Sequence, residues 1–169
     1  MKKTNNVLPC CYVPADSKFY KALMRILETD WSSHHDILTD IRSKVFIEEQ
    51  QVPADLEIDE HDSEAIHFLV LSEDKQFIAT ARLLNDGHIG RIAVLKEYRN
   101  QGIGTKLLSD ILCKAKQLNL TRVFLNAQVN AEKFYGNHGF VSEGEIFMDA
   151  GIPHIKMTKK LNYERNHFI

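Results

Sequence analysis

Residues 91–105 read RIAVLKEYRNQGIGT, a short apolar strand that runs through a glycine turn into a helix. Gly102 and Gly104 stand where the helix begins, and Arg99 precedes them. The first N–H groups of a helix have no partner within the helix and lie at the positive end of its dipole. Glycine lets a bulky anion approach those groups closely. The stretch therefore predicts a backbone cradle for a phosphate.

The segments on either side of the turn predict a mixed α/β fold. Turn signals separate three short strands before it, which favours antiparallel hairpins. Strand, helix and strand then follow within about 40 residues, so the two strands of this βαβ unit are expected to be parallel. We expect a central mixed sheet flanked by helices. The expected strands are 22–27, 66–71, 77–84, 89–95, 122–127 and 154–161, and the expected helices are 36–50, 102–118 and 130–137.

Composition narrows the class of protein. The 169 residues suffice for one domain, and we expect a polar arm at 1–18 before a single domain at 19–169. The net charge of −2 gives no general attraction to nucleic acid or anionic membranes. No apolar run approaches the roughly 20 residues that cross a bilayer. Cys10, Cys11 and Cys113 make a poor disulfide framework, so a reducing cytoplasm is expected.

Three interpretations of the glycine turn compete. A P-loop requires Gly-Lys-Ser/Thr, whereas Gly104 is followed by Thr105 and Lys106. A dinucleotide-binding turn requires a third glycine where Leu107 stands, and an acid near the end of the next strand, where Asn126 stands. The third alternative is a glycine turn that merely begins a helix.

Two blocks of sequence carry a resemblance to a known family. Residues 99–104, RNQGIG, resemble the Arg/Gln-x-x-Gly-x-Gly/Ala signature of the GCN5-related N-acetyltransferase (GNAT) superfamily. Residues 128–140, QVNAEKFYGNHGF, are similar to a later segment of that family. Residues 45–50, 59–62 and 151–154 resemble a group of small bacterial proteins related to ElaA and YjcF. The resemblance implies the GNAT fold.

The resemblance spans residues 45–161 and implies an acetyl-CoA-dependent N-acyltransferase. Such an enzyme moves an acetyl group to an amine of a small molecule or peptide, directly in a ternary complex. The turn would hold the pyrophosphate, and the strand before it would pair with the pantetheine arm. Gln128 stands where the family usually has asparagine. The expected cofactor contacts are Ile92, Ala93, Val94, Arg99, Asn100, Gln101, Gly102, Ile103, Gly104, Thr105, Gln128, Ala131 and Phe134.

Acetyl transfer to an amine requires an acid and a base. By resemblance, Tyr135 protonates the leaving thiolate, with a half-buried structural aromatic as the alternative. An alkylamine has a pKa of about 10.4, so a base must remove its proton at neutral pH. Glu60 and His61 are the candidates for that base. His154 is a candidate for substrate contact or proton relay, with a structural role as the alternative.

Acceptor binding is expected near an acidic segment. Residues 48–64 hold eight carboxylates and no lysine or arginine, and an acidic rim would concentrate a cationic amine. A solvated loop is the alternative for most of them. Asp59 in this segment and Asn126 at a strand end are the expected acceptor contacts. His67 falls on a predicted strand, where a satisfied half-buried histidine is expected.

Several partners are expected or rejected from the sequence. The eight histidines show no metal-binding spacing, so no metal is expected. Neither nucleic acid nor a membrane is an expected partner, and relatives of this kind often dimerise, so a homodimer is one expectation. Two rival functions remain: a CoA-binding or CoA-sensing domain without turnover, and an acyl-homoserine-lactone synthase, which shares the superfamily fold.

Overall fold

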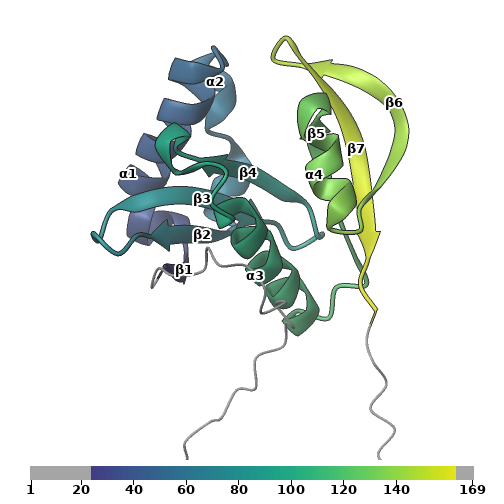
Figure 1. Cartoon of the computed structure of the whole chain (residues 1–169), viewed down its shortest axis with the longest axis horizontal. Helices are drawn as coiled ribbons and strands as arrows, with labels where there is room; N and C mark the ends of the chain where they lie inside the picture. The colour runs from purple at the N-terminus through teal and green to yellow at the C-terminus, as the bar shows by residue number, and fades with distance from the viewer. Residues whose placement is uncertain (1–23, 163–169) are drawn as a thin grey trace, which may run out of the picture.

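The computed structural model describes residues 24–162, so Cys10, Cys11 and the expected arm at 1–18 lie outside the described residues. Two antiparallel sheets stand at an angle to each other (Figure 1). The first has the order β1-β2-β3-β4, and the second has the order β5-β7-β6. Their bounds are β1 Arg25–Thr29, β2 Ile66–Leu71, β3 Phe77–Leu83, β4 Ile89–Val94, β5 Arg122–Gln128, β6 Val141–Asp149 and β7 Ile152–Lys160.

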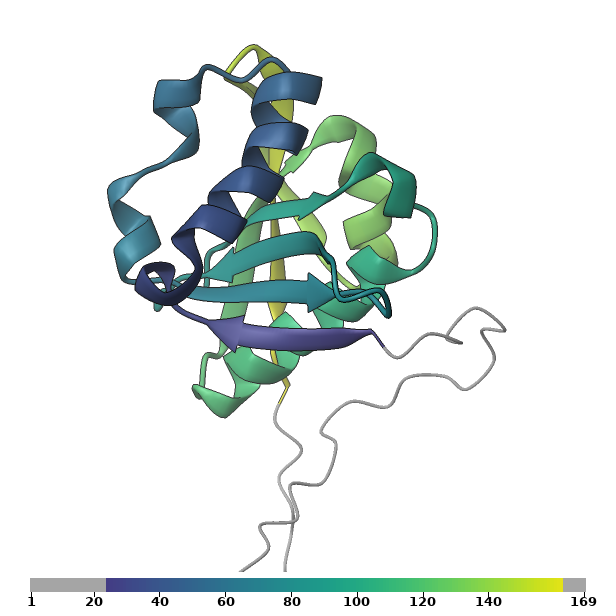
Figure 2. The same ribbon diagram turned by 90° about the vertical axis from the view of Figure 1, so that its left-hand side faces the viewer.

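Helices cover both faces of the first sheet. Helix α1 (Trp31–Arg42) crosses one face, and α3 (Ile103–Gln117) lies behind the other (Figure 2). Leu69 of β2 packs in the cluster beneath α1, whereas Phe68 and Val70 pack in the main core with α3. Because both faces of β2 are buried, its sequence is apolar at nearly every position instead of alternating.

The first helix begins earlier than the sequence predicted. Asp30 caps it, since its carboxylate accepts a hydrogen bond from the Ser33 N–H at 2.8 Å. The helical segment between Asp30 and Ile37 is mostly polar, so it lacks the apolar periodicity that marked the predicted helix at 36–50. The chain then continues as a π-helix over Ser43–Glu49. This form is rare overall, and where it occurs it is often found at functional sites.

The second sheet contains a strand that the sequence analysis did not predict. All nine residues of β6 are exposed, so no alternation of apolar and polar side chains marks it. Helix α4 (Glu132–Asn137) lies between β5 and β6 in the chain and confirms the predicted short helix. The first strand, β1, is displaced toward the C-terminus from the predicted 22–27, of which 22–23 lie outside the described residues.

Strands β4 and β5 are parallel, as predicted, but they diverge. A parallel bridge joins His88 to Phe124, and the Phe124 N–H donates to the Gly87 carbonyl at 3.0 Å. Further along, β4 bulges: Arg91 has a φ of +51°, and the register with β3 shifts beside it. A left-handed residue in a bulge turns the strand aside. The expected single mixed sheet is therefore divided into two.

Candidate active site

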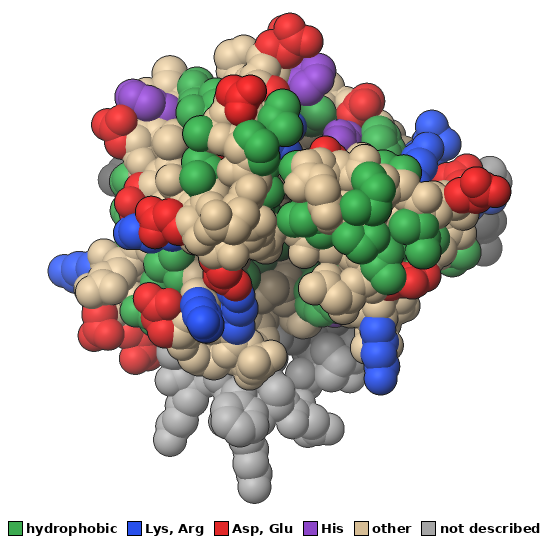
Figure 3. Space-filling view, turned by 90° about the horizontal axis from the view of Figure 1, so that it is seen from above, with side chains coloured by type: hydrophobic (Ala, Val, Ile, Leu, Met, Phe, Trp, Pro, Cys, Tyr) green, Lys and Arg blue, Asp and Glu red, His purple; other side chains and the backbone are tan. Residues whose placement is uncertain are grey.

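A cavity of about 490 Å³ lies where β4 and β5 diverge. Its walls come from the π-helix, α2 (Ala54–Glu57), β4, β5, α4 and the β6–β7 hairpin. Seen from above, the surface is hollowed between the side that carries α2 and the side that carries this hairpin (Figure 3). The predicted site residues that line the cavity are Asp59, His61, Ile92, Asn126, Gln128, Ala131, Tyr135 and His154.

The glycine turn lies at the N-terminus of α3, outside the cavity lining. Asn100 and Gly102 have φ values of +61° and +79°, a region that glycine adopts without strain. Within residues 24–162, no side chain caps α3, so the N–H groups of its first turn remain available to an anion. A Cβ built on Gly104 would stand 3.4 Å from Cζ of Phe134, so this glycine brings the turn and α4 close together.

Arg99 is paired with a protein carboxylate. Its Nη1 and Nη2 donate to the two carboxylate oxygens of Glu49 at 2.6 and 2.7 Å, and its Nε donates to the Val94 carbonyl at 2.9 Å. The hydrogen bond with Glu49 raises the pKa of Arg99. The guanidinium group of Arg99, expected beside a phosphate, is therefore paired with the carboxylate of Glu49 at the end of the π-helix.

Of the three residues expected to pair with the pantetheine arm through their backbone, Ile92 lines the cavity. Ala93 is almost fully buried in the cluster beneath α1. Val94 stands opposite Ala79 in β3. The bulge at Arg91 immediately precedes this trio, so it directs the backbone that lies beside the cavity.

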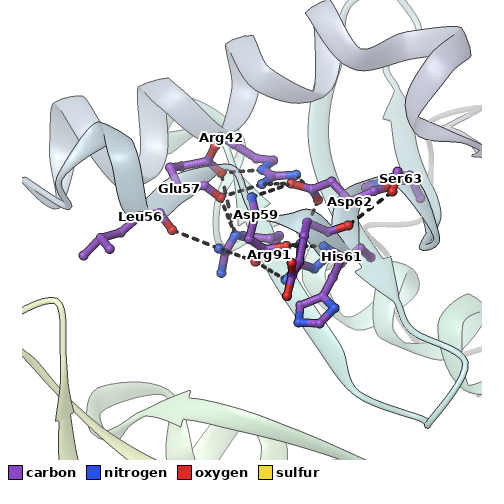
Figure 4. Close-up of polar contacts among 11 residues, drawn as sticks. Arg42, Leu56, Glu57, Asp59, His61, Asp62, Ser63 and Arg91 are labelled. Carbon is purple, nitrogen blue, oxygen red and sulfur yellow. Dashed lines mark hydrogen bonds and ion pairs between the residues drawn. The ribbon is translucent and has the colours of Figure 1, made fainter.

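A network of buried ion pairs forms part of the cavity wall, and the sequence analysis did not predict it (Figure 4). Its members Glu57, Asp59, Arg82 and Arg91 line the cavity, whereas Arg42 and Asp62 do not. Arg42 has no exposed surface and donates to Glu57 and to both oxygens of Asp62, at 2.8 and 2.9 Å for Asp62. Arg82 also donates to Asp62 at 2.8 Å. Burial opposes ionisation of Asp62, but hydrogen bonds and charge from the two arginines outweigh it and lower its pKa to about 2. One signal was available, because Arg42 falls within an apolar helical stripe.

Asp59 belongs to the same network. Arg82 donates to its two oxygens at 2.6 and 2.7 Å, and Arg91 donates to it at 3.0 Å. Burial opposes ionisation here too, yet the pKa of Asp59 is lowered by Arg82 and Arg91. The expected acidic rim along 48–64 is therefore wrong for Glu57 and for both aspartates of this network, whose charges are neutralised by arginine.

Tyr135 lies in the cavity wall on α4. Its ring meets Phe134 and Phe140 edge to face, with centroid distances of 5.0 and 5.9 Å. Burial raises the pKa of its hydroxyl to about 12, because the charged phenolate is disfavoured away from water. The phenol is therefore protonated at neutral pH and has a proton to donate.

His154 lines the cavity from β7. Its Nδ1 lies 2.8 Å from the Ile152 carbonyl oxygen, which can only accept, so Nδ1 carries the proton and Nε2 of the neutral ring is an acceptor. The ring stacks with Phe147 at 6.0 Å. His61 also lines the cavity, and its ring points away from the buried network (Figure 4). Glu60 is exposed and does not line the cavity.

Amide side chains join two walls of the cavity. Gln128 Nε2 donates to Gln50 Oε1 at 2.7 Å, which links the end of β5 to the end of the π-helix. The amide expected at the pantetheine arm is thus already oriented by a protein partner. Asn126, two positions earlier in β5, faces the same side of the strand and lines the cavity.

Among residues 24–162, no group of histidine, cysteine and carboxylate side chains is placed to hold a metal ion. The Nε2 of His67 donates to the Asp62 backbone carbonyl at 2.8 Å, which confirms a satisfied histidine, but the side chain is fully buried instead of half-buried as predicted. No described helix is long and apolar enough to cross a membrane.

Comparisons with known proteins give one consistent family. A family model described as an acetyltransferase (GNAT) domain matches residues 22–161. YjcF of Bacillus subtilis, described as an uncharacterized N-acetyltransferase, is 40% identical over 123 residues, which cover 70% of this chain and 87% of YjcF. Two solved structures each have a TM-score of 0.71 and cover 80% of this chain and 99% of their own. They are an acyl-CoA N-acyltransferase from Pseudomonas aeruginosa, 30% identical, and Escherichia coli ElaA, 27% identical.

Proposed function

The chain belongs to the GNAT family of N-acetyltransferases, as its two sequence blocks predicted, and we propose that it transfers acetyl groups from acetyl-CoA directly to an amine in one ternary complex. The acceptor is an amine of a small molecule or peptide. One observation carries the proposal: a protonated Tyr135 lines a cavity between the two strands that diverge beside the glycine turn. A cytoplasmic location and a homodimer remain part of this proposal.

The residues of the chain fit an acyl-CoA donor, which supplies an activated thioester. The uncapped first turn of α3, with Gly102 in a left-handed conformation, offers N–H groups to the pyrophosphate. Ile92, beside the bulge of β4, offers backbone groups to the pantetheine arm and to the thioester carbonyl. Gln128 offers an amide at the opposite wall.

Proton transfers can be assigned to two residues of the cavity. Transfer joins the amine nitrogen to the acyl carbon and breaks the carbon–sulfur bond. Tyr135 gives its phenolic proton to the leaving sulfur, and Nε2 of His154 takes the proton of the amine. His61 is the second candidate for the base, because it also lines the cavity.

Direct transfer is favoured over an acetylated cysteine. Cys113 lies in α3 and does not line the cavity, so the described chain offers no thiol there to carry an acetyl group. Cys10 and Cys11 lie outside the described residues.

Replacement of Gly102 by valine tests the donor site. The Gly102→Val variant should lose CoA binding in calorimetry, because a branched side chain would occupy the approach to the N–H groups and oppose a φ of +79°. Gly144→Val is the matched control, since Gly144 has a φ of +84° but lies in β6 with open space around it. Equal CoA affinity in both variants would refute the pyrophosphate assignment.

Thiol release from acetyl-CoA, measured over a broad panel of amines, separates the enzyme from a CoA sensor. The transferase predicts acceptor-dependent release by the unmodified chain. Tight CoA binding without release for every amine would favour the sensor.

A further inference from the structure

The cavity wall offers less negative charge than the sequence indicates. Its lining carboxylates are Glu57, Asp59 and Asp149. The first two are paired with arginines of the buried network. In the part of the chain that the structure describes, Asp149 forms no ion pair, and it is exposed. An entering amine thus meets one carboxylate that has no arginine partner.

The remaining charges of the acidic segment lie elsewhere. Glu49 is paired with Arg99. Asp62 is paired with Arg42 and Arg82 in the buried network. The last four carboxylates are exposed and do not line the cavity; they are Glu48, Asp55, Glu60 and Glu64. A polyamine needs several carboxylates at spaced positions, and the cavity does not supply them within the described chain. Burying a second ammonium group without a partner would be costly.

Asp149 faces the cavity from the same side of the sheet as His154. In the register of β6 and β7, Phe147 stands opposite His154, and Asp149 stands opposite Ile152. Residues two apart on a strand share a face, so Asp149 and Phe147 point to the side of His154. The free carboxylate and the proposed base are therefore adjacent parts of one wall.

Apolar side chains make up much of the remaining wall. Phe46, Val52, Leu125 and Ile152 line the cavity together with Leu56, which is 53% exposed. Phe147 does not itself line the cavity, but it is 38% exposed and stacks with His154, which does. Apolar side chains gather on both sides of the hollow (Figure 3). Exposed apolar surface at the mouth of a cavity marks a binding site, because covering it removes it from water.

We propose that the acceptor is a primary monoamine with an apolar or aromatic body. Its ammonium group is drawn to Asp149, and its body covers Leu56 and Phe147. A cavity of about 490 Å³ is within the range that holds a small organic molecule. This inference rests on the proposed amine acetyltransferase activity and specifies the acceptor for the same site.

Hexylamine and 1,6-diaminohexane form a matched pair of probes, since they differ only in the second amine. We expect kcat/KM for hexylamine to exceed that for the diamine by about tenfold or more, in a thiol-release assay with the full chain and acetyl-CoA. Leu56→Ser should lower kcat/KM for hexylamine by about tenfold and leave ethylamine nearly unchanged, because ethylamine is too short to cover this side chain. Leu118→Ser is the control, since Leu118 is 40% exposed and outside the cavity.

Asp149→Asn should raise KM for hexylamine more than it lowers kcat. Preference for the diamine or for spermidine would overturn the acceptor class while leaving acetyl transfer established. Equal effects of Leu56→Ser on hexylamine and ethylamine would also overturn it. Absence of release with every amine, while CoA binds, would refute the transferase and this inference together.

Discussion

Single residues in this protein owe their chemistry to burial and to their partners. Tyr135 keeps its proton because the phenolate would be away from water. Asp62 is buried as well, yet its pKa is lowered because Arg42 and Arg82 donate to its carboxylate. His154 presents Nε2 because a backbone carbonyl holds Nδ1. In each case the neighbours shift the pKa away from its ordinary value or select the ring nitrogen that carries the proton.

Tyr135→Phe should lower kcat by about 100-fold or more, the range typical of a lost general acid, and leave the affinity for CoA nearly unchanged. The substitution removes one hydroxyl and keeps the ring contacts with Phe134 and Phe140. Steady-state kinetics and calorimetry measure the two quantities separately. An unchanged kcat would remove Tyr135 from the proton transfer.

Asp62→Asn should lower the free energy of unfolding by about 3–5 kcal/mol, because it leaves buried arginines without their full charge partner. Asp40→Asn is the matched control: Asp40 forms an exposed pair with Lys44 at 2.8 Å, and its loss should cost less than about 0.5 kcal/mol. Urea denaturation measures both. Equal effects would mean that the buried network contributes no more than a surface pair.

The free energy of unfolding should decrease as the pH is lowered through the interval between the unfolded and folded pKa values of Asp62. Its pKa is about 2 in the folded chain and 3.8 without these contacts. A lowered pKa stabilises the fold above pH 3.8 and ceases to do so as the pH falls toward 2. Urea midpoints measured across this interval should decrease for the unmodified chain and decrease less for Asp62→Asn. Parallel pH profiles would contradict the assigned shift.

Two secondary-structure elements, β4 and the π-helix, position the residues of the proposed site. The bulge in β4 separates this strand from β5, and Arg91 holds it by donating to the backbone carbonyls of Leu56 and Glu57 at 3.1 and 3.0 Å. The π-helix ends beside both halves of the site, since Glu49 pairs with Arg99 and the next residue bonds to β5. These contacts connect the wall of the cavity formed by β5 with the glycine turn before α3.

Two substitutions of Arg91, to glycine and to alanine, test the bulge, because the backbone conformation decides which of the two variants is more stable. In an ordinary strand, alanine is more stable than glycine by roughly 0.5–1 kcal/mol. At a φ of +51° the order should reverse, so Arg91→Gly should be more stable than Arg91→Ala by about 1 kcal/mol. Both variants lack the guanidinium group, so the comparison isolates the backbone. Greater stability of the alanine variant would mean that β4 has no fixed bulge.

The whole molecule is organised around the angle between its two sheets. The first sheet is covered on both faces by helices, whereas β6 lies exposed at the edge of the second sheet (Figure 1). The proposed donor contacts come from β4, α3 and α4, and the proposed acceptor contacts come from α2 and the β6–β7 hairpin. Both substrates must therefore occupy the same opening at once.

Simultaneous occupancy predicts a kinetic pattern. Double-reciprocal plots of initial rate against amine, at several fixed concentrations of acetyl-CoA, should intersect, because the proposed transfer takes place in a ternary complex. A covalent acetyl-enzyme would instead produce parallel lines. Cys113→Ser should leave the rate nearly unchanged, since Cys113 does not line the cavity.

Much of the fold could be predicted from local pattern. Strands β2, β3 and β4 are rich in apolar side chains and α3 carries an apolar stripe at helical spacing, and the structure confirms all four, whereas β1 is displaced from its predicted position. Strand β6 has no such period, because every one of its residues is exposed. The arginine network escaped prediction for a different reason: its partners are about 15 to 30 residues apart, and a carboxylate in a loop looks solvated until its arginine is located.

The sequence by itself determined the family and led to the proposed donor site. A glycine turn between a strand and a helix, and the block at 128–140, are local features whose geometry follows from backbone conformation. Tertiary structure alone decided the charge and shape of the acceptor cavity. Those properties depend on which arginine reaches which carboxylate, and on a bulge that separates two strands. Both arise from contacts between segments distant in the chain, which no local pattern records.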